Sequence, residues 1–251
     1  MPNGSHPVFA QPADPDISIW RYMEFAKFVS MLSSGKLFLT RADKLGDPFE
    51  GSFPKLNTED SIYRIPDEVA HVPGGKENYL NQLRQLRNYI KEIRAWVFVS
   101  CWHMSEHESA GMWKLYARTE EAICIRSKYS ALKTLLPPKA ELGKVAYVDY
   151  DTYAMPIDSL LWPFVHKRKS FEHEREVRAV MAEIHDPAET PRPIPPEGGL
   201  SIDTDLNKLI EAVHVAPFAP NWFKETVEHT VRKFGFQFPV YHSKIGEKPL
   251  W

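Results

Sequence analysis

Cysteine is scarce in this sequence of 251 residues, which holds only Cys101 and Cys124. So few cysteines exclude both a disulfide framework and a zinc site built from cysteine pairs. Both lie in apolar runs that are typical of strands, so we expect buried free thiols. A catalytic thiol at Cys101 would need an adjacent base, and His103 is the nearest histidine in the sequence.

Long apolar runs and a strong net charge are also missing. No stretch approaches the roughly 20 apolar residues of a membrane span, and the first residues, 1–11, lack the cationic and apolar regions of a signal peptide. We therefore expect a bacterial cytoplasmic protein without a membrane partner. The formal net charge is -2, so no overall basic field attracts nucleic acid, although a local patch such as the basic face of residues 77–94 stays open.

Motifs for several common chemistries are absent. The sequence contains no glycine-rich phosphate loop and no serine nucleophile elbow. His103, Glu106, His107 and Glu108 gather two histidines and two acids, but their spacing matches no tetrahedral zinc motif. We expect a solvated polar loop there and no metal site.

Hydrophobic periodicity predicts an α+β fold. The apolar patterns favour strands at 17–22, 36–40, 95–102, 122–126, 142–150, 176–184, 212–216 and 238–243, and helices at 24–34, 77–94, 111–117, 130–136, 159–171, 206–211 and 221–234. Strands and helices do not alternate regularly, so a doubly wound parallel sheet is not expected. We predict an irregular arm at 1–16, then a single domain at 17–251 with a mixed, largely antiparallel sheet flanked by helices. The proline-rich segment 186–199 predicts a loop or linker.

The most informative segment carries charged residues at alternating positions. If a strand begins at Glu174, then Glu174, Glu176 and Arg178 share one face. Two close carboxylates raise each other's pKa, and the guanidinium opposes that rise. Such a set is suited to general-base catalysis or to stabilising a cation. A solvated charge ladder or a structural ion pair gives the same pattern.

Other candidate residues lie in three further segments. Arg21, near the first strand, can clamp a phosphate or carboxylate, or lie on the surface. Asp47 and Glu50 flank an Asp-Pro turn and either cap it or point into a cleft. Trp113 and Tyr116 share a helical face that either packs in the core or lines a pocket for a flat ring.

Short motifs follow one another in a recognisable order. They are Arg21-Tyr22, Asp47-Pro48-Phe49-Glu50, Val99-Ser100-Cys101-Trp102, Met112 to Ala117, Lys167 with Phe171, Glu174, Glu176, Val177 and Arg178, and a last segment from Val215 to Ser243. In this order the chain resembles the bacterial domain-of-unknown-function 2971 family over residues 17–245. The resemblance implies a fold but no settled activity, and it adds Tyr22 and Lys167 to the candidate ligand-binding residues.

A second resemblance is to the ADP-ribosyltransferase fold. Those enzymes pair an early Arg or His with a serine-containing strand and a late Glu-x-Glu, and this chain has Arg21, Ser100 and Glu174 with Glu176 in that order. The resemblance implies NAD as the substrate. Arginine would hold its phosphates, aromatic side chains would enclose nicotinamide, and a carboxylate would stabilise the oxocarbenium-like ribose.

Three functions therefore stay open. The first is an ADP-ribosyltransferase-like or NAD-cleaving enzyme of a phage-defence or toxin system, with Glu176 as the catalytic carboxylate, Glu174 as its partner and Arg178 beside them. The second is a non-catalytic module that binds a nucleotide or a protein. The third is a nuclease or another nucleic-acid-binding protein.

Overall fold

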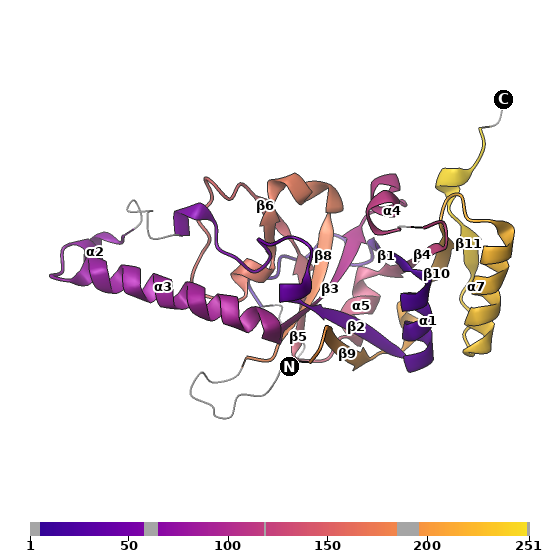
Figure 1. The fold of residues 1–251 in the computed structure, drawn as a ribbon, viewed down its shortest axis with the longest axis horizontal. Coiled ribbons are helices and arrows are strands. Elements are labelled where there is room, and N and C mark those ends of the chain that lie inside the picture. The colour runs from indigo at the N-terminus through magenta and orange to yellow at the C-terminus, as the bar shows by residue number, and fades with distance from the viewer. Residues whose placement is uncertain (1–5, 58–64, 118, 185–195, 250–251) are drawn as a thin grey trace.

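A computed structural model describes residues 6–57, 65–117, 119–184 and 196–249 (Figure 1). Its strands are β1 (Ser18–Glu24), β2 (Lys36–Arg41), β3 (Val97–Met104), β4 (Ala122–Lys128), β5 (Ala140–Lys144), β6 (Ala146–Val148), β7 (His166–Arg168), β8 (Glu176–Ala182), β9 (Gly199–Asp203), β10 (Ala212–Val215) and β11 (Val240–His242). Its α-helices are α1 (Phe25–Ser34), α2 (Asp67–Ala70), α3 (Gly75–Ile93), α4 (Ala110–Tyr116), α5 (Tyr129–Leu135), α6 (Leu206–Leu209) and α7 (Asn221–Lys233).

The main sheet has nine strands and confirms the predicted α+β class. Strands β11, β10, β4, β1, β3, β2 and β9 follow one another in space, while β8 pairs with β3 and β5. Every pairing in this sheet is antiparallel except that of β10 with β11, and β6 and β7 form a separate parallel pair. In Figure 1, α3 extends away from the sheet on one side, while α1 and α7 lie at the other end.

The sheet forks at β3. Strand β8 pairs with β3 from Val97 to His103 and so occupies one edge of it. On the other edge, β1 pairs at the His103 end and β2 pairs at the Val99 end. Between these ends β1 and β2 diverge. The paired strands β3 and β8 therefore connect the part of the sheet that contains β1 with the part that contains β2.

The two faces of β3 pack into different hydrophobic clusters. Phe98 and Trp102 belong to the larger cluster, with α1, α5 and α7. Val97 and Val99 alternate with them and belong to a smaller cluster that includes Ile90 at the end of α3. This alternation follows from the two-residue period of a strand. Cys101, which packs against the smaller cluster, and His103 continue the same face of β3 toward its end.

The N-terminal arm packs against the edge strand β5. Residues 6–16 form neither helix nor strand, yet Val8 and Phe9 are buried. The backbone N–H of Lys144 donates to the carbonyl of Ala10 at 2.7 Å. A Cβ atom at Gly143 would meet backbone and side-chain atoms of Phe9 at 2.8 to 2.9 Å, so this close approach requires glycine.

Three predicted elements differ from the structure. The segment predicted as a helix at 159–171 instead forms the 3₁₀ turn η5 (Trp162–Phe164), β7 and the start of the 3₁₀ helix η6 (Lys169–Glu174). Pro163 confines the helical geometry to one turn, and Lys167 is drawn inward to buried carboxylates. The predicted strand 142–150 bends at Val145 into β5 and β6, and β9 begins at the end of the predicted loop 186–199, most of which lies outside the described residues.

Candidate active site

Five charged side chains meet in a buried cluster on one face of β8. Glu50, Lys167, Glu174, Glu176 and Arg178 are between 1% and 7% exposed. The Arg178 guanidinium forms two hydrogen bonds with Glu50, at 2.9 and 3.1 Å, and two with Glu176, at 2.7 and 3.0 Å. The Lys167 ammonium donates to Glu174 and lies 3.3 Å from Glu50 and 3.4 Å from Glu176.

Separate segments of the chain bring these groups together. Glu176 and Arg178 alternate along β8, and Lys167 comes from β7. Glu50 lies in the turn that begins at Asp47, whose backbone carbonyl accepts the Glu50 N–H at 3.0 Å. Glu174 ends η6, so the prediction that Glu174 lies on the strand with Glu176 is wrong. It reaches the cluster through Lys167 instead.

Arg175 explains how two successive glutamates enter the same cluster. Its φ of 42° places it in the left-handed region, and it is the non-glycine residue in the described parts of the chain with this conformation. Arg175 ends η6 and leads directly into β8; Glu174 and Glu176 on either side of it are buried, while Arg175 is exposed. Such strained backbone positions cluster at functional sites.

The cluster keeps the Glu176 carboxylate ionised. Burial opposes ionisation, but the charges of Arg178 and Lys167 and the hydrogen bonds of Arg178 outweigh it and lower the Glu176 pKa to about 2. The same carboxylates raise the pKa of Lys167 and of Arg178 against the effect of burial. Three carboxylates share two cations, so the cluster holds one more negative than positive group.

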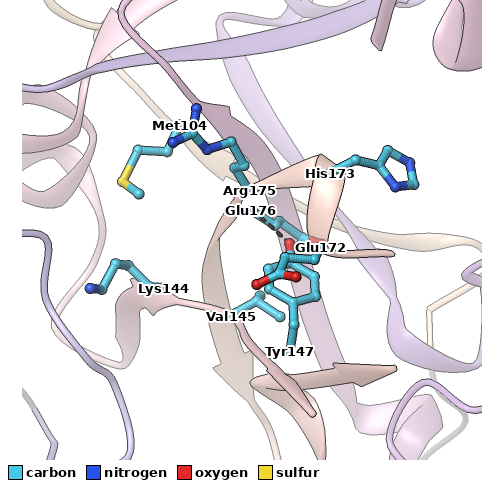
Figure 2. A pocket seen from close by; sticks show the side chains of 8 residues that line it. All are labelled: Met104, Lys144, Val145, Tyr147, Glu172, His173, Arg175 and Glu176. Atoms are coloured by element: carbon cyan, nitrogen blue, oxygen red, sulfur yellow. Dashed lines mark hydrogen bonds between the residues drawn. The ribbon is translucent and has the colours of Figure 1, made fainter. Parts of the chain in front are cut away.

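A groove of about 480 Å³ opens beside Glu176 (Figure 2). We call it the Glu176 groove; its lining residues are Met104, Lys144, Val145, Tyr147, Glu172, His173, Arg175 and Glu176. The Tyr147 hydroxyl accepts the Glu176 backbone N–H at 2.7 Å, which fixes the start of β8 against β6. Lys144 and Arg175 bring positive charge to the groove.

Cys101 and His103 of β3 face the same side as Glu176 and Arg178. The register pairs Cys101 with Arg178 and His103 with Glu176. The Cys101 thiol is hydrogen-bonded to the Glu176 carboxylate, and burial together with that negative charge raises its pKa. Cys101 and Cys124 are both free thiols, as the sequence predicts; Cys124 is buried and Cys101 is half-buried.

Arg21 and Ser100 lie on the other face of the forked sheet. Trp20 pairs with His103 and shares its face, so Arg21 points the opposite way, with its guanidinium carbon 5.8 Å from the centre of the Trp102 ring. The Trp102 indole donates to Ser100 Oγ at 3.1 Å. The Arg21 Nη2 group donates to the Phe38 carbonyl, and burial lowers the Arg21 pKa to about 10. The structure therefore does not bring Arg21 and Ser100 together with Glu176.

The candidate aromatic residues have different surroundings. Tyr22 and Trp113 are buried with ring centres 5.0 Å apart, and their polar atoms are bonded to Ser109 and Glu108. Tyr116 is 43% exposed, and its hydroxyl donates to Glu174 Oε1 at 3.3 Å. Tyr116 is thus the candidate aromatic side chain that borders the charged cluster.

Asp47 forms a second ion pair next to the cluster. Its carboxylate accepts from Arg168 at 2.8 Å and from the Phe49 backbone N–H at 3.1 Å. The Arg168 guanidinium also stacks 4.3 Å from the Phe49 ring centre. Asp47 therefore holds the turn that carries Glu50 into the cluster.

Several residues lie close to Glu176 although no sequence pattern predicts their position there. Lys144 and Tyr147 lie on the predicted strand 142–150, whose two-residue period puts them on opposite faces, and no pattern links them with the distant β8. The sequence does not predict the left-handed conformation of Arg175, because arginine seldom adopts positive φ. The sequence predicts His103 in a polar loop, with a possible role as a base for Cys101, whereas it belongs to β3.

Two further observations concern metals and membranes. In the described parts of the chain, no group of three or more histidine, cysteine, aspartate or glutamate side chains is arranged to hold a metal ion. Across those same ranges, none of the helices has both the length and the apolar character to cross a bilayer.

Comparison with known proteins gives structural similarity only. No protein-family model matches the chain, and no curated protein matches it in sequence. Solved structures of Thermus sp. 2.9 DarT are similar at 10% sequence identity: the complex with NAD+ has a TM-score of 0.43 and covers 95% of this chain and 100% of its own. The complexes with carba-NAD+ and with ADP-ribosylated ssDNA have TM-scores of 0.41 and 0.42, and they cover 93% and 94% of this chain and 97% and 96% of their own. Similarity at this level carries no statement about activity.

Proposed function

We propose that the chain is an ADP-ribosyltransferase-like enzyme that binds NAD in the Glu176 groove and cleaves the bond between nicotinamide and ribose. The observation that carries this proposal is Glu176 itself, a buried and ionised residue that is among those lining an open groove. Arg21, on the other face of the sheet, has no part in it.

The chemistry of the bond explains why an ionised carboxylate is needed. When the glycosidic bond breaks, its electron pair leaves with nicotinamide and positive charge develops on the ribose. A fixed anion close to that charge stabilises the transition state. Because the Glu176 pKa is about 2, the group carries its negative charge at physiological pH, and it cannot serve as a general acid there.

Two cations of the groove suit the diphosphate of NAD. Lys144 lies on one side of the Glu176 groove and Arg175 on another (Figure 2). An arginine binds phosphate oxygens through paired N–H groups, and a lysine binds them as a point charge. The exposed ring of Tyr116, beside Glu174, offers a surface for a flat nicotinamide ring.

A second candidate function is a binding module without catalysis. The mutual pairing in the cluster favours it, since Arg178 engages two carboxylates and Lys167 lies near three. In that case the cluster fixes the positions of β7, β8 and the Glu50 turn, and a nucleotide or protein binds to the rigid surface that results.

Measurement of nicotinamide release from NAD separates the two functions. We expect the wild-type protein to release nicotinamide and Glu176→Gln to lose about 100-fold or more in kcat, with NAD binding retained. Glu225→Gln, at an exposed position of α7, is the matched control and should behave as the wild type. NAD binding without any nicotinamide release by the wild type would favour the binding module. Equal rates for wild type and Glu176→Gln would remove Glu176 from the reaction.

A further inference from the structure

His103 occupies a defined position next to Glu176. The two residues are directly paired between β3 and β8, so their Cβ atoms are about 5 Å apart. The His103 Nδ1 atom lies 2.6 Å from the backbone carbonyl oxygen of Glu174. Since a carbonyl only accepts, Nδ1 carries the proton, and the lone pair of the neutral ring is on Nε2. Within the described residues, Nε2 has no hydrogen-bond partner.

Groups from β1, η6 and β8 surround the His103 side chain. They are the Tyr22 ring of β1, with its centre 6.4 Å from the imidazole centre, Glu174 and His173 of η6, Arg175 after it, and Glu176 of β8. Burial lowers the His103 pKa, and the charges of Arg175 and His173 lower it further, while the bond to Glu174 opposes this. The imidazole is therefore neutral at pH 7.

Three polar groups near His103, namely Glu176, Tyr116 and Tyr147, are poor proton acceptors. Glu176 has a pKa of about 2, so it is a very weak base. Burial raises the pKa values of Tyr116 and Tyr147, which keeps both hydroxyls protonated at neutral pH. Among these four groups His103 is the neutral imidazole, and the lone pair on its Nε2 atom can accept a proton.

We propose that His103 is the general base of the reaction, a role that rests on the proposed function. Its Nε2 atom takes the proton of the acceptor as the acceptor's oxygen or nitrogen bonds to ribose C1′. The bond from C1′ to the nicotinamide nitrogen breaks, and its electron pair leaves with nicotinamide. The imidazolium then returns the proton to solvent, so no further reactant is needed when water is the acceptor.

His103→Asn tests this role without removing the structural bond. The asparagine amide N–H takes the place of Nδ1–H toward the Glu174 carbonyl, but the side chain has no basic atom at Nε2. We expect ADP-ribose formation from NAD to fall about 100-fold in kcat with little change in KM. We also expect the wild-type rate to fall at acidic pH, where the imidazole takes up a proton, and this fall to be absent in His103→Asn. His229→Asn, exposed on α7, is the control and should keep the wild-type profile.

The outcomes separate this inference from the proposed function. If the wild type forms ADP-ribose and His103→Asn keeps both the rate and its decline at acidic pH, the base role is wrong while the enzyme stands. If the wild type forms none from bound NAD, the proposed function and the base role are both overturned. A circular-dichroism melting curve like that of the wild type establishes that His103→Asn is folded.

Discussion

At the scale of single residues, the molecule concentrates charge where most proteins place apolar side chains. Arg178 is 1% exposed and satisfies Glu50 and Glu176 at once, while its Nη1 group also donates to the Phe164 carbonyl at 2.8 Å. Burying these ions is costly, and only their mutual hydrogen bonds offset the loss of water. The cluster therefore depends on each member being present.

Arg178→Met tests that dependence. The substitution leaves Glu50 and Glu176 buried without their guanidinium, and we expect a loss of about 3 to 5 kcal/mol in the free energy of unfolding. Urea denaturation measures it. Lys139→Met breaks a surface ion pair with Glu183 and should change stability by less than about 0.5 kcal/mol. Equal small effects from both substitutions would mean that the buried pairs contribute little.

Acid should weaken the fold through Glu176. Its pKa is about 2 in the folded protein, below the ordinary 4.5, so its contribution is complete above about pH 4.5 and is lost as the pH falls toward 2. The difference corresponds to roughly 3 kcal/mol. Glu108, whose pKa is also lowered to about 2, despite burial, by bonds that include His214, Ser243 and Trp113, adds to the same decline.

Unfolding free energies at pH 7, 5, 4 and 3 check this expectation. The decline between pH 5 and pH 3 should be smaller in Glu176→Gln than in the wild type, and it should not vanish because Glu108 remains. If the free energy of unfolding falls by the same amount in the wild type and in Glu176→Gln as the pH is lowered, the pKa of Glu176 is not lowered in the folded protein.

The sequence predicted part of this site. The two-residue period correctly put Glu176 and Arg178 on one face of a strand, and the Asp47 turn proved to carry Glu50. The separation of Arg21 from Glu176 could not be predicted, because it depends on the register between β1 and β3. A shift of one residue in a strand exchanges its faces, and no local pattern in β1 fixes that choice.

At the scale of elements, apolar periodicity identified most helices and strands, and it failed where polar contacts decide the conformation. Gly35 ends α1 in the left-handed conformation, with φ of 66°, as its position after an apolar stripe predicts. The segment around Lys167 shows the opposite case. The 3₁₀ turn η5, the short strand β7 and the start of the 3₁₀ helix η6 replace the expected helix, because Lys167 is held by the buried carboxylates of Glu50 and Glu174.

Gly143→Ala tests the contact between β5 and the N-terminal arm. The new methyl group would lie 2.8 Å from the Phe9 Cα atom, so we expect the arm to be displaced and stability to fall by about 1 to 3 kcal/mol. Limited proteolysis should then cut the chain near Gln11 sooner than in the wild type. Gly46→Ala is the control, because a methyl group at Gly46 would have no atom within 4 Å and the φ of this residue is not positive. If the chain of Gly143→Ala is cleaved at the wild-type rate, the arm keeps its position on β5 and this prediction is wrong.

At the scale of the whole molecule, the forked sheet organises the site. The irregular order of the predicted elements was sufficient to predict a mixed, largely antiparallel sheet flanked by helices, because that order reflects the chain as a whole. The fork itself arises from the pairing of β1 and β2 with opposite ends of β3. The register of β1 against β3 puts Arg21 and Glu176 on different faces, so the site that we propose, the Glu176 groove, does not include Arg21.

A crystal structure with NAD bound tests the central claim most directly, through the distance from ribose C1′ to the Glu176 carboxylate. We expect NAD in the Glu176 groove, with C1′ about 3.5 Å from a Glu176 oxygen and the diphosphate against Lys144 and Arg175. NAD bound beside Arg21 on the opposite face, with no contact to any of the five charged groups, would contradict the proposal.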